Sequence, residues 1–314
     1  MQSLPRSWRV LALSSALGCA AAACAVEGSG SDVGTGSTGM ETLPPVSDGT
    51  GDEIQVAPVA GCNKMDVLFV IDNSSSMTEE QANLSENFPR FIEVLEEFRD
   101  GAVDYRVAVT TTGLDLGDLP FGPPIEIPGE NGALVQQTTC GMTQPWLERG
   151  DPGLLSCYAC NATVGVSGSS NEMPLLAARL ALTERIVDGT NLGFLRDDAL
   201  LAIVIVTDED DHSIDPDRGA TELNADIPVS AFIADFDDLK GDPGRWAAAV
   251  IAGDKQPSCD SAFGTATNAL KLRSFVDMVG ENAVFSSICE GDLATGLSDA
   301  IQTFALACDA FPII

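Results

Sequence analysis

The chain has 314 residues, of which 45% are hydrophobic, so it is long enough to bury one large core or two small ones. Its 47 acidic residues outnumber its 16 lysines and arginines, and the formal net charge is −31. Such a surface repels nucleic acids and anionic membranes and favours metal ions or basic partners. The charge therefore argues against nucleic-acid binding and leaves two interpretations open, a role linked to cations and solubility alone.

The N-terminus has the layout of an export signal. Arg6 and Arg9 precede an apolar run, 10–18, which is too short to anchor the chain across a bilayer. The stretches ALGC and AAAC end at Cys19 and Cys24, and both resemble the lipobox of bacterial lipoproteins, although each has Ala three positions before the cysteine. We expect a signal over 1–24 and lipidation at Cys19, with Cys24 as the alternative and plain cleavage after Ala-Cys-Ala as the competing interpretation. The expected location is the outer membrane, the cell surface or the periplasm of a bacterium.

A polar spacer separates this signal from the predicted folded domain. Residues 25–61 are rich in Gly, Ser, Thr and Pro and contain no Lys or Arg. Such a composition buries too little apolar surface to fold, so we expect a disordered linker. The domain is expected over 62–309, and no segment after the signal approaches 18 uninterrupted apolar residues.

The nine cysteines fit an exported chain, in which cysteines usually form disulfides. Seven of them fall in the predicted domain, so one thiol should be left over. The expected pairs are Cys259–Cys289, Cys62–Cys308 and Cys140 with either Cys157 or Cys160.

From Cys62 onward, apolar runs alternate with segments of helical periodicity. Strands are expected at 65–71, 104–112, 199–207, 245–253 and 283–289. Helices are expected at 77–100, 171–187, 227–240, 266–280 and 292–306, with Pro89 bending or interrupting the first. Residues 113–165 lack periodicity and indicate a loop-rich insertion that carries cysteines. This order predicts a doubly wound α/β fold, with a mostly parallel sheet and helices on both faces.

Oxygen-bearing side chains follow two of the predicted strands. Asp72 and Asp208 come directly after apolar runs, so they should share the edge where a parallel sheet binds ligands. The turn Asp72-Asn73-Ser74-Ser75-Ser76 places one carboxylate and two hydroxyls at alternate positions. Hard oxygen ligands of low charge suit Mg²⁺, and the serines of 167–170 offer a further hydroxyl.

These residues resemble the von Willebrand factor A domain, also called the I domain in integrins, over roughly 64–306 apart from the insertion. The resemblance implies a metal-ion-dependent adhesion site in which Asp72, Ser74 and Ser76 form the Asp-x-Ser-x-Ser motif and Asp208 is the later aspartate. The family has a threonine in a second loop. Counting back from the core helix gives Ser169, with Ser167 and Ser170 as alternatives, and Ser169 could instead only cap a helix in a capping box with Glu172. The resemblance implies Mg²⁺, with Mn²⁺ or Ca²⁺ as alternatives, and an open position filled by a carboxylate of a protein or surface ligand.

Two other patterns have more than one interpretation. Glu209, Asp210 and Asp211 could form a second cation site, orient water around the first, or belong to a solvated acidic loop. The spacing of these acids does not fit an EF-hand. His212 is the sole histidine, and no nucleophile-elbow motif accompanies it.

The sequence therefore predicts a metal-dependent binding module outside the cytoplasm that is not an enzyme. A structural envelope domain with a vestigial metal site is the first alternative. A metal-dependent hydrolase is the second, and it would need a general base from 209–211. Nothing in the sequence indicates oligomerisation.

Overall fold

The computed structural model describes residues 61–114, 129–215, 226–262, 264–291 and 293–312. The predicted signal, the lipidation candidates Cys19 and Cys24 and almost all of the predicted linker lie outside these residues. Within the described ranges, no helix is both long enough and apolar enough to cross a membrane.

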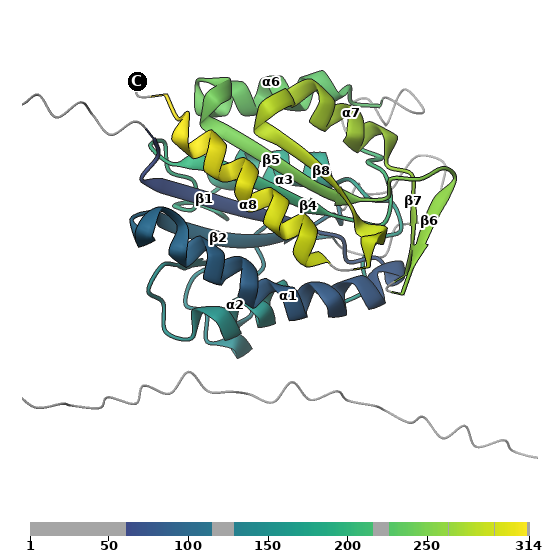
Figure 1. Ribbon diagram of the computed structural model, residues 1–314, viewed down its shortest axis with the longest axis horizontal. Coiled ribbons are helices and arrows are strands. Elements are labelled where there is room, and N and C mark those ends of the chain that lie inside the picture. The colour runs from purple at the N-terminus through teal and green to yellow at the C-terminus, as the bar shows by residue number, and fades with distance from the viewer. Residues whose placement is uncertain (1–60, 115–128, 216–225, 263, 292, 313–314) are drawn as a thin grey trace, which may run out of the picture.

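A six-stranded sheet forms the centre of the domain, in the order β3-β2-β1-β4-β5-β8 (Figure 1). The strands are β1 (Lys64–Ile71), β2 (Asp104–Thr111), β3 (Trp146–Glu148), β4 (Leu200–Val206), β5 (Trp246–Ala252) and β8 (Ala283–Ser287). Only β3, at the edge, runs antiparallel to its neighbour. The predicted doubly wound α/β fold and its five apolar strands are confirmed.

Helices cover both faces of the sheet, as the strand–helix alternation predicts. One face carries α1 (Thr78–Glu97), α2 (Leu154–Ala162) and α8 (Leu293–Asp309). The other carries α3 (Pro174–Leu182), α4 (Glu184–Val187), α6 (Val229–Lys240) and α7 (Leu270–Val279). Short 3₁₀ turns occupy Ser75–Met77, Phe98–Gly101, Thr138–Cys140, Pro243–Arg245, Gly280–Asn282 and Ile288–Glu290.

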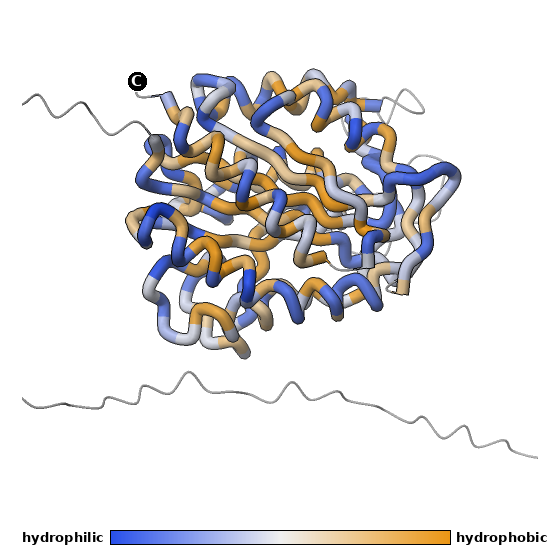
Figure 2. Tube along the Cα trace, in the orientation of Figure 1, coloured by the Kyte–Doolittle hydropathy of each residue, from blue (hydrophilic) through white to orange (hydrophobic). Residues whose placement is uncertain are grey.

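The core consists of two apolar layers separated by the sheet. Strands β4 and β5 are buried along their whole length, and β1 is buried from its second residue onward, because helices cover both of their faces. In Figure 2 the central strands are hydrophobic, whereas hydrophilic segments gather along the outside of the helices. Alternate residues of each strand therefore enter opposite layers, which fixes the register of the sheet.

The long insertion differs from its prediction as a loop-rich segment. It contributes the edge strand β3 and the helix α2, which packs against α1. The ring of Tyr158 in α2 lies edge-on to Phe69 and Phe88, with centroids 5.6 and 4.7 Å away. A three-residue strand and a nine-residue helix are too short to show a clear period, so tertiary packing defines both.

Two helix predictions need correction, and one alternative for a third is excluded. α1 continues through Pro89 without interruption, and Phe88 and Phe91 on either side of the proline pack against Phe69. The expected helix at 171–187 divides at Thr183 into α3 and α4. The expected helix at 266–280 begins only at Leu270, because the residues before it pair in a hairpin of β6 (Ser258–Ser261) and β7 (Gly264–Thr267).

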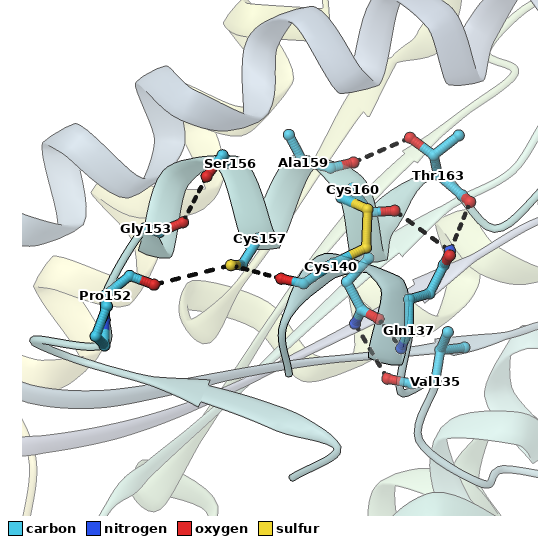
Figure 3. Close-up of a disulfide and its surroundings, with 11 residues drawn as sticks. Val135, Gln137, Cys140, Pro152, Gly153, Ser156, Cys157, Ala159, Cys160 and Thr163 are labelled. Atoms are coloured by element: carbon cyan, nitrogen blue, oxygen red, sulfur yellow. Dashed lines mark hydrogen bonds between the residues drawn. A yellow bond between two sulfur atoms is a disulfide. The ribbon is translucent and has the colours of Figure 1, made fainter. Parts of the chain in front are cut away.

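The disulfides are Cys62–Cys308, Cys140–Cys160 and Cys259–Cys289. Two are the expected pairs, and the third decides between the two partners left open for Cys140. Figure 3 shows that the sulfur of Cys157 lies instead against the main chain, 2.8 Å from the carbonyl oxygen of Cys140. Cys157 is therefore the buried odd thiol that the count of cysteines requires.

Candidate functional site

The carboxyl ends of β1 and β4 bring Asp72 and Asp208 to one edge of the sheet. The two strands are parallel neighbours, and Ile71 stands opposite Val206 in their register. The main-chain nitrogen of Asp72 donates to the oxygen of Val206 at 2.9 Å, and the Thr207 hydroxyl donates to Oδ2 of Asp72 at 2.7 Å. Both aspartates are buried, with 0% and 2% of their surface exposed.

The turn after β1 gathers the hydroxyls of the predicted motif. Oδ1 of Asp72 accepts from the main-chain nitrogen of Ser74 at 2.7 Å, which closes the turn. The Ser74 and Ser76 hydroxyl oxygens are 2.9 Å apart, and Ser76 lies close enough to Asp208 to lower the pKa of its carboxyl group. Asp72, Ser74, Ser76 and Asp208 therefore lie together at this edge. Ser76 is exposed, so solvent reaches the group from that side.

The predicted second loop lies against this turn. The main-chain nitrogen of Gly168 donates to the oxygen of Asn73 at 2.7 Å. A Cβ atom at Gly168 would stand 2.0 Å from Oδ1 of Asn73, so this close approach requires glycine. Ser169 is half-buried in the same loop, and its hydroxyl accepts from the main-chain nitrogen of Asn171 at 3.0 Å. Ser169 thus lies in the loop beside the motif. Its hydroxyl takes part in a hydrogen bond within that loop.

Glu172, which the sequence analysis considered only as part of a capping box, lies at the same edge and feels the charges of Asp72 and Asp208. The side chain is fully buried, and its Oε2 accepts from the hydroxyl of Thr112, the residue after β2. No side chain caps α3, so the capping box that was the alternative interpretation of Ser169 does not form. An acidic residue at the start of an otherwise apolar segment was the available signal, since such a residue is rarely buried without a function.

Several buried oxygens at this edge have no hydrogen-bond partner among the residues that the structure describes. They are Oδ1 of Asp208, Oε1 of Glu172, Oε2 of Glu80 and Oδ1 of Asn73. Buried polar groups almost always have partners, so each exception needs a physical reason. All four are acceptors, and a cation bound at this edge would satisfy such a group where additional acceptors could not.

Burial and mutual repulsion raise the pKa values of these carboxyl groups. Burial raises the pKa of Asp208 to about 7, with a further rise from the charge of Asp72 and a partial offset from the Ser76 hydrogen bond. Burial and Asp72 raise the pKa of Glu172 to about 8. Burial is also the main cause of the rise to about 7 for Glu80, on the first turn of α1. Within the described part of the chain, none of these carboxylates forms an ion pair.

The acidic loop after β4 has mostly structural contacts. Asp210 accepts from the main-chain nitrogens of Lys271 and Leu272 and so holds the start of α7. Asp211 accepts from the main-chain nitrogen of Leu175 in α3 at 3.0 Å and pairs with the ammonium group of Lys271 at 3.0 Å. These partners leave Glu209 as the half-buried acid of the loop without such a role. Burial is the main cause of its raised pKa, followed by the charge of Asp72.

The β6–β7 hairpin, which the sequence analysis missed, forms a wall beside the site. The main-chain nitrogen of Thr267 donates to the oxygen of Asp208 at 2.7 Å. Gly264 has a φ of +125°, and a Cβ there would stand 1.9 Å from Oε1 of Glu80. The hairpin is therefore seated against both β4 and α1, and the Cys259–Cys289 disulfide holds it to the segment after β8.

The oxygen atoms of this group suit a divalent cation, although carboxylates alone do not surround a position for one. In the described ranges, no three or more His, Cys, Asp and Glu side chains are grouped closely enough to hold an ion by themselves. An ion at this edge would therefore depend on the Ser74 and Ser76 hydroxyls as well as on Asp72 and Asp208. Hydroxyl and carboxylate oxygens together are ligands that Mg²⁺ and Ca²⁺ accept.

Comparison with known proteins gives similarity of structure only. No protein-family model matches the chain, and no curated protein matches it. Proximal thread matrix protein 1 (PTMP1) from the mussel byssus, crystal form 2, aligns with a TM-score of 0.40 at 11% identity, over 78% of this chain and 49% of that chain. The structure of PTMP1 with a zinc-occupied MIDAS motif aligns with a TM-score of 0.40 at 12% identity, over 78% and 49% of the two chains.

The pilus adhesin SpaC from Lactobacillus rhamnosus GG, in its open conformation, aligns with a TM-score of 0.41 at 10% identity, over 79% of this chain and 30% of that chain. The chain thus spans about half or less of the length of these proteins. Similarity at this level assigns no role to any residue of this chain.

Proposed function

We propose that the carboxyl edge of the sheet binds a divalent cation through Asp72, Ser74, Ser76 and Asp208, and that the chain is a cation-dependent binding module. One observation carries the proposal. Among the described residues, Oδ1 of Asp208 is buried without a hydrogen-bond partner, and the Ser76 hydroxyl only partly offsets the rise in its pKa that burial and the charge of Asp72 cause. A carboxylate in that position is stable when a cation neutralises it.

The residues have distinct roles in this proposal. Asp72 is held by Thr207 and by the main chain of Ser74, so its charge is fixed at the end of β1. Ser74 and Ser76 offer neutral oxygens, and the second loop places Ser169 nearby as a further candidate ligand. The bound cation would supply positive charge on an otherwise acidic edge. The exposed side at Ser76 leaves it within reach of an oxygen from a partner.

The resemblance to the von Willebrand factor A family supports a partner outside the cytoplasm that is a protein or a surface ligand. In that family the partner's group is a carboxylate. Three disulfides are typical of proteins exported to an oxidising compartment. Attachment to a bacterial envelope through a lipid on Cys19, or on Cys24, remains part of the proposal.

The hydrolase alternative has little support at this edge. It would need a general base within 209–211, where the carboxylates of Asp210 and Asp211 are occupied by helix-terminal nitrogens and by Lys271, so that Glu209 alone is left for this role. A structural envelope domain with a vestigial site is the alternative that an experiment can separate from a binding module, because such a domain would bind no cation.

Isothermal titration calorimetry of the full chain with Ca²⁺, Mg²⁺ and Mn²⁺ tests the proposal. We expect saturable binding that weakens at least about tenfold in Asp208→Asn, since the variant loses one charge of the site and keeps an oxygen for Ser76. Asp198→Asn is the matched control, because it removes one acidic charge from a side chain that is 64% exposed next to Lys64, at the other edge of the sheet. Equal binding by all three proteins would refute the proposal.

A further inference from the structure

We infer that a groove between α1 and α2 is a second binding surface, and that it takes a lysine- or arginine-bearing segment of a partner protein. The groove lies apart from the proposed cation site. That site adjoins the start of α1 at Thr78, whereas the groove follows residues 92–97, about 20 Å further along the helix. The inference therefore goes beyond the proposed function and does not depend on it.

The groove is an apolar hollow of about 570 Å³ between the last turns of α1 and the start of α2. Figure 1 shows α2 alongside α1 on the outer side of the domain. Three apolar side chains contribute to the lining. Ile92 and Leu154 are buried, and Leu155 has 38% of its surface exposed. An apolar group that entered the hollow would lose its contact with water, which favours binding.

Acidic side chains surround this apolar lining. Glu93 and Glu97 are exposed one helical turn apart on α1, and Asp151 lies across the groove in the loop before α2. None of these three forms an ion pair with another residue that the structure describes. The fourth acid, Glu96, pairs with Arg149 at 3.3 Å. The groove therefore carries three negative charges that no described lysine or arginine balances.

Hydrogen bonds fix the loop that forms one side of the groove. Oδ2 of Asp151 accepts from the main-chain nitrogen of Glu148 at 2.8 Å, and the oxygen of Asp151 accepts from the nitrogen of Leu154 at 3.2 Å. The guanidinium group of Arg149 donates to the main-chain oxygen of Glu96 at 3.3 Å and so joins the loop to α1. A partner would meet a surface that is already formed, which lowers the entropic cost of binding.

An apolar hollow edged by carboxylates matches the chemistry of lysine and arginine. Each has an aliphatic stem that packs on apolar surface and a cationic head that reaches a carboxylate. Nucleic acids, anionic membranes and acidic proteins would be repelled from the same place. The net charge of −31 attracts basic partners to the whole surface, but the apolar lining adds contacts that only the groove offers. We therefore assign the groove to a basic protein segment that also carries apolar residues.

Isothermal titration calorimetry of the full chain with a short peptide of alternating lysine and leucine tests the inference. We expect saturable binding in the presence of EDTA. The double variant Glu93→Gln with Glu97→Gln should bind about fivefold more weakly, because each ion pair at an exposed rim contributes modestly.

The matched control is the double variant Asp277→Asn with Glu281→Gln. These two acids are also exposed and four positions apart, but they lie on α7 and in the turn after it, over the other face of the sheet. The control removes the same charge from the protein and should leave the affinity for the peptide unchanged. Equal losses in the two double variants would mean that the peptide follows the overall charge, and the inference would be wrong.

The apolar lining is tested by Leu155→Ala, which keeps every charge. We expect the affinity for the peptide to fall about threefold, because part of the apolar lining is lost. Leu270→Ala is its control, since Leu270 is 55% exposed on α7, and it should have no effect.

The outcomes separate the inference from the proposed function. Absence of saturable peptide binding by the wild-type protein overturns the inference and leaves cation binding untouched. Peptide binding that is lost in Asp208→Asn would belong to the cation edge and would also overturn it. Because the peptide is titrated in EDTA and the cations are titrated without peptide, failure of one result does not decide the other.

Discussion

A buried aspartate lies near each end of strand β1. The two aspartates differ in the groups that balance their charge. Asp66, near the start of the strand, is fully buried and accepts from Nε and from the main-chain nitrogen of Arg196, at 2.8 and 2.6 Å. Asp72, just past the end of the strand, is equally buried, but the charged groups around it are Asp208, Glu172, Glu209 and Glu80.

At the amino edge of the sheet, where the parallel strands begin, side chains of the protein itself balance the buried charge. Arg196 also pairs with Asp104 at 2.8 Å, and the buried ammonium group of Lys240 donates to the main-chain oxygen of Arg196 at 2.8 Å. The Cys62–Cys308 disulfide joins the start of β1 to the end of α8 at the same edge, where the two ends of the described domain meet (Figure 1). The protein thus neutralises the buried carboxylate of Asp66 with an arginine. Among the described residues, no arginine or lysine does so for Asp72 or Asp208.

The largest effect is expected from removing the disulfide at the amino edge. Replacing both Cys62 and Cys308 by Ala should lower the free energy of unfolding by about 5 kcal/mol, because the disulfide spans 246 residues and chain-entropy loss grows with loop length. The same change at Cys140 and Cys160, 20 residues apart, should lower it by about 3 kcal/mol. Urea denaturation of the oxidised proteins measures both, and equal losses would contradict the loop-length argument.

A comparable effect is expected at the ion pair of the amino edge. Arg196→Met leaves Asp66 buried without its cationic partner, so the free energy of unfolding should fall by about 3–5 kcal/mol. Thermal unfolding followed by circular dichroism measures this change. Arg273→Met, which removes a guanidinium group packed over the ring of Phe285, is the control and should lose far less.

The opposite sign is expected at the candidate site. Without divalent cations at pH 8, Asp208→Asn should raise the free energy of unfolding by about 1–2 kcal/mol, because it removes a buried charge that Asp72 repels. Saturating Ca²⁺ should cancel or reverse this gain, since the wild-type protein then has its counter-ion. A loss of stability in the cation-free variant would mean that the carboxylate already has a balancing partner.

A further effect concerns pH. Asp208, Glu172 and Glu80 have pKa values of about 7, 8 and 7, above those of the unfolded chain, so the folded state binds more protons than the unfolded state between about pH 4 and pH 8. The cation-free protein should therefore lose stability as the pH rises through this window. Thermal scans with and without Ca²⁺ should show that the stabilisation by the ion grows with pH, and Glu172→Gln should flatten this trend. A stabilisation that is independent of pH would contradict it.

Most of the architecture was predictable because it depends on long apolar runs. The strands β1, β4 and β5 are continuous hydrophobic segments. The helices between them connect parallel strands, so the order of elements predicts a parallel sheet. The same topology placed Asp72 and Asp208 on one edge. The hairpin β6–β7, the strand β3 and the helix α2 were missed because each is short and is stabilised by contacts with distant residues.

The sequence alone determined the sheet, its carboxyl edge, the Asp-x-Ser-x-Ser turn and the one thiol left over among the seven cysteines of the domain, because each follows from a local pattern or from counting. Only the tertiary structure decided which cysteine pairs with Cys140 and that Glu172 is buried close to the other carboxylates. Glu172 and Ser169 stand three positions apart, and the sequence analysis assigned Ser169 to the candidate site, with a capping box of the two residues as the alternative. The contact that separates them is with Thr112, which lies 60 residues away in the chain and is brought near by the pairing of β1 with β2.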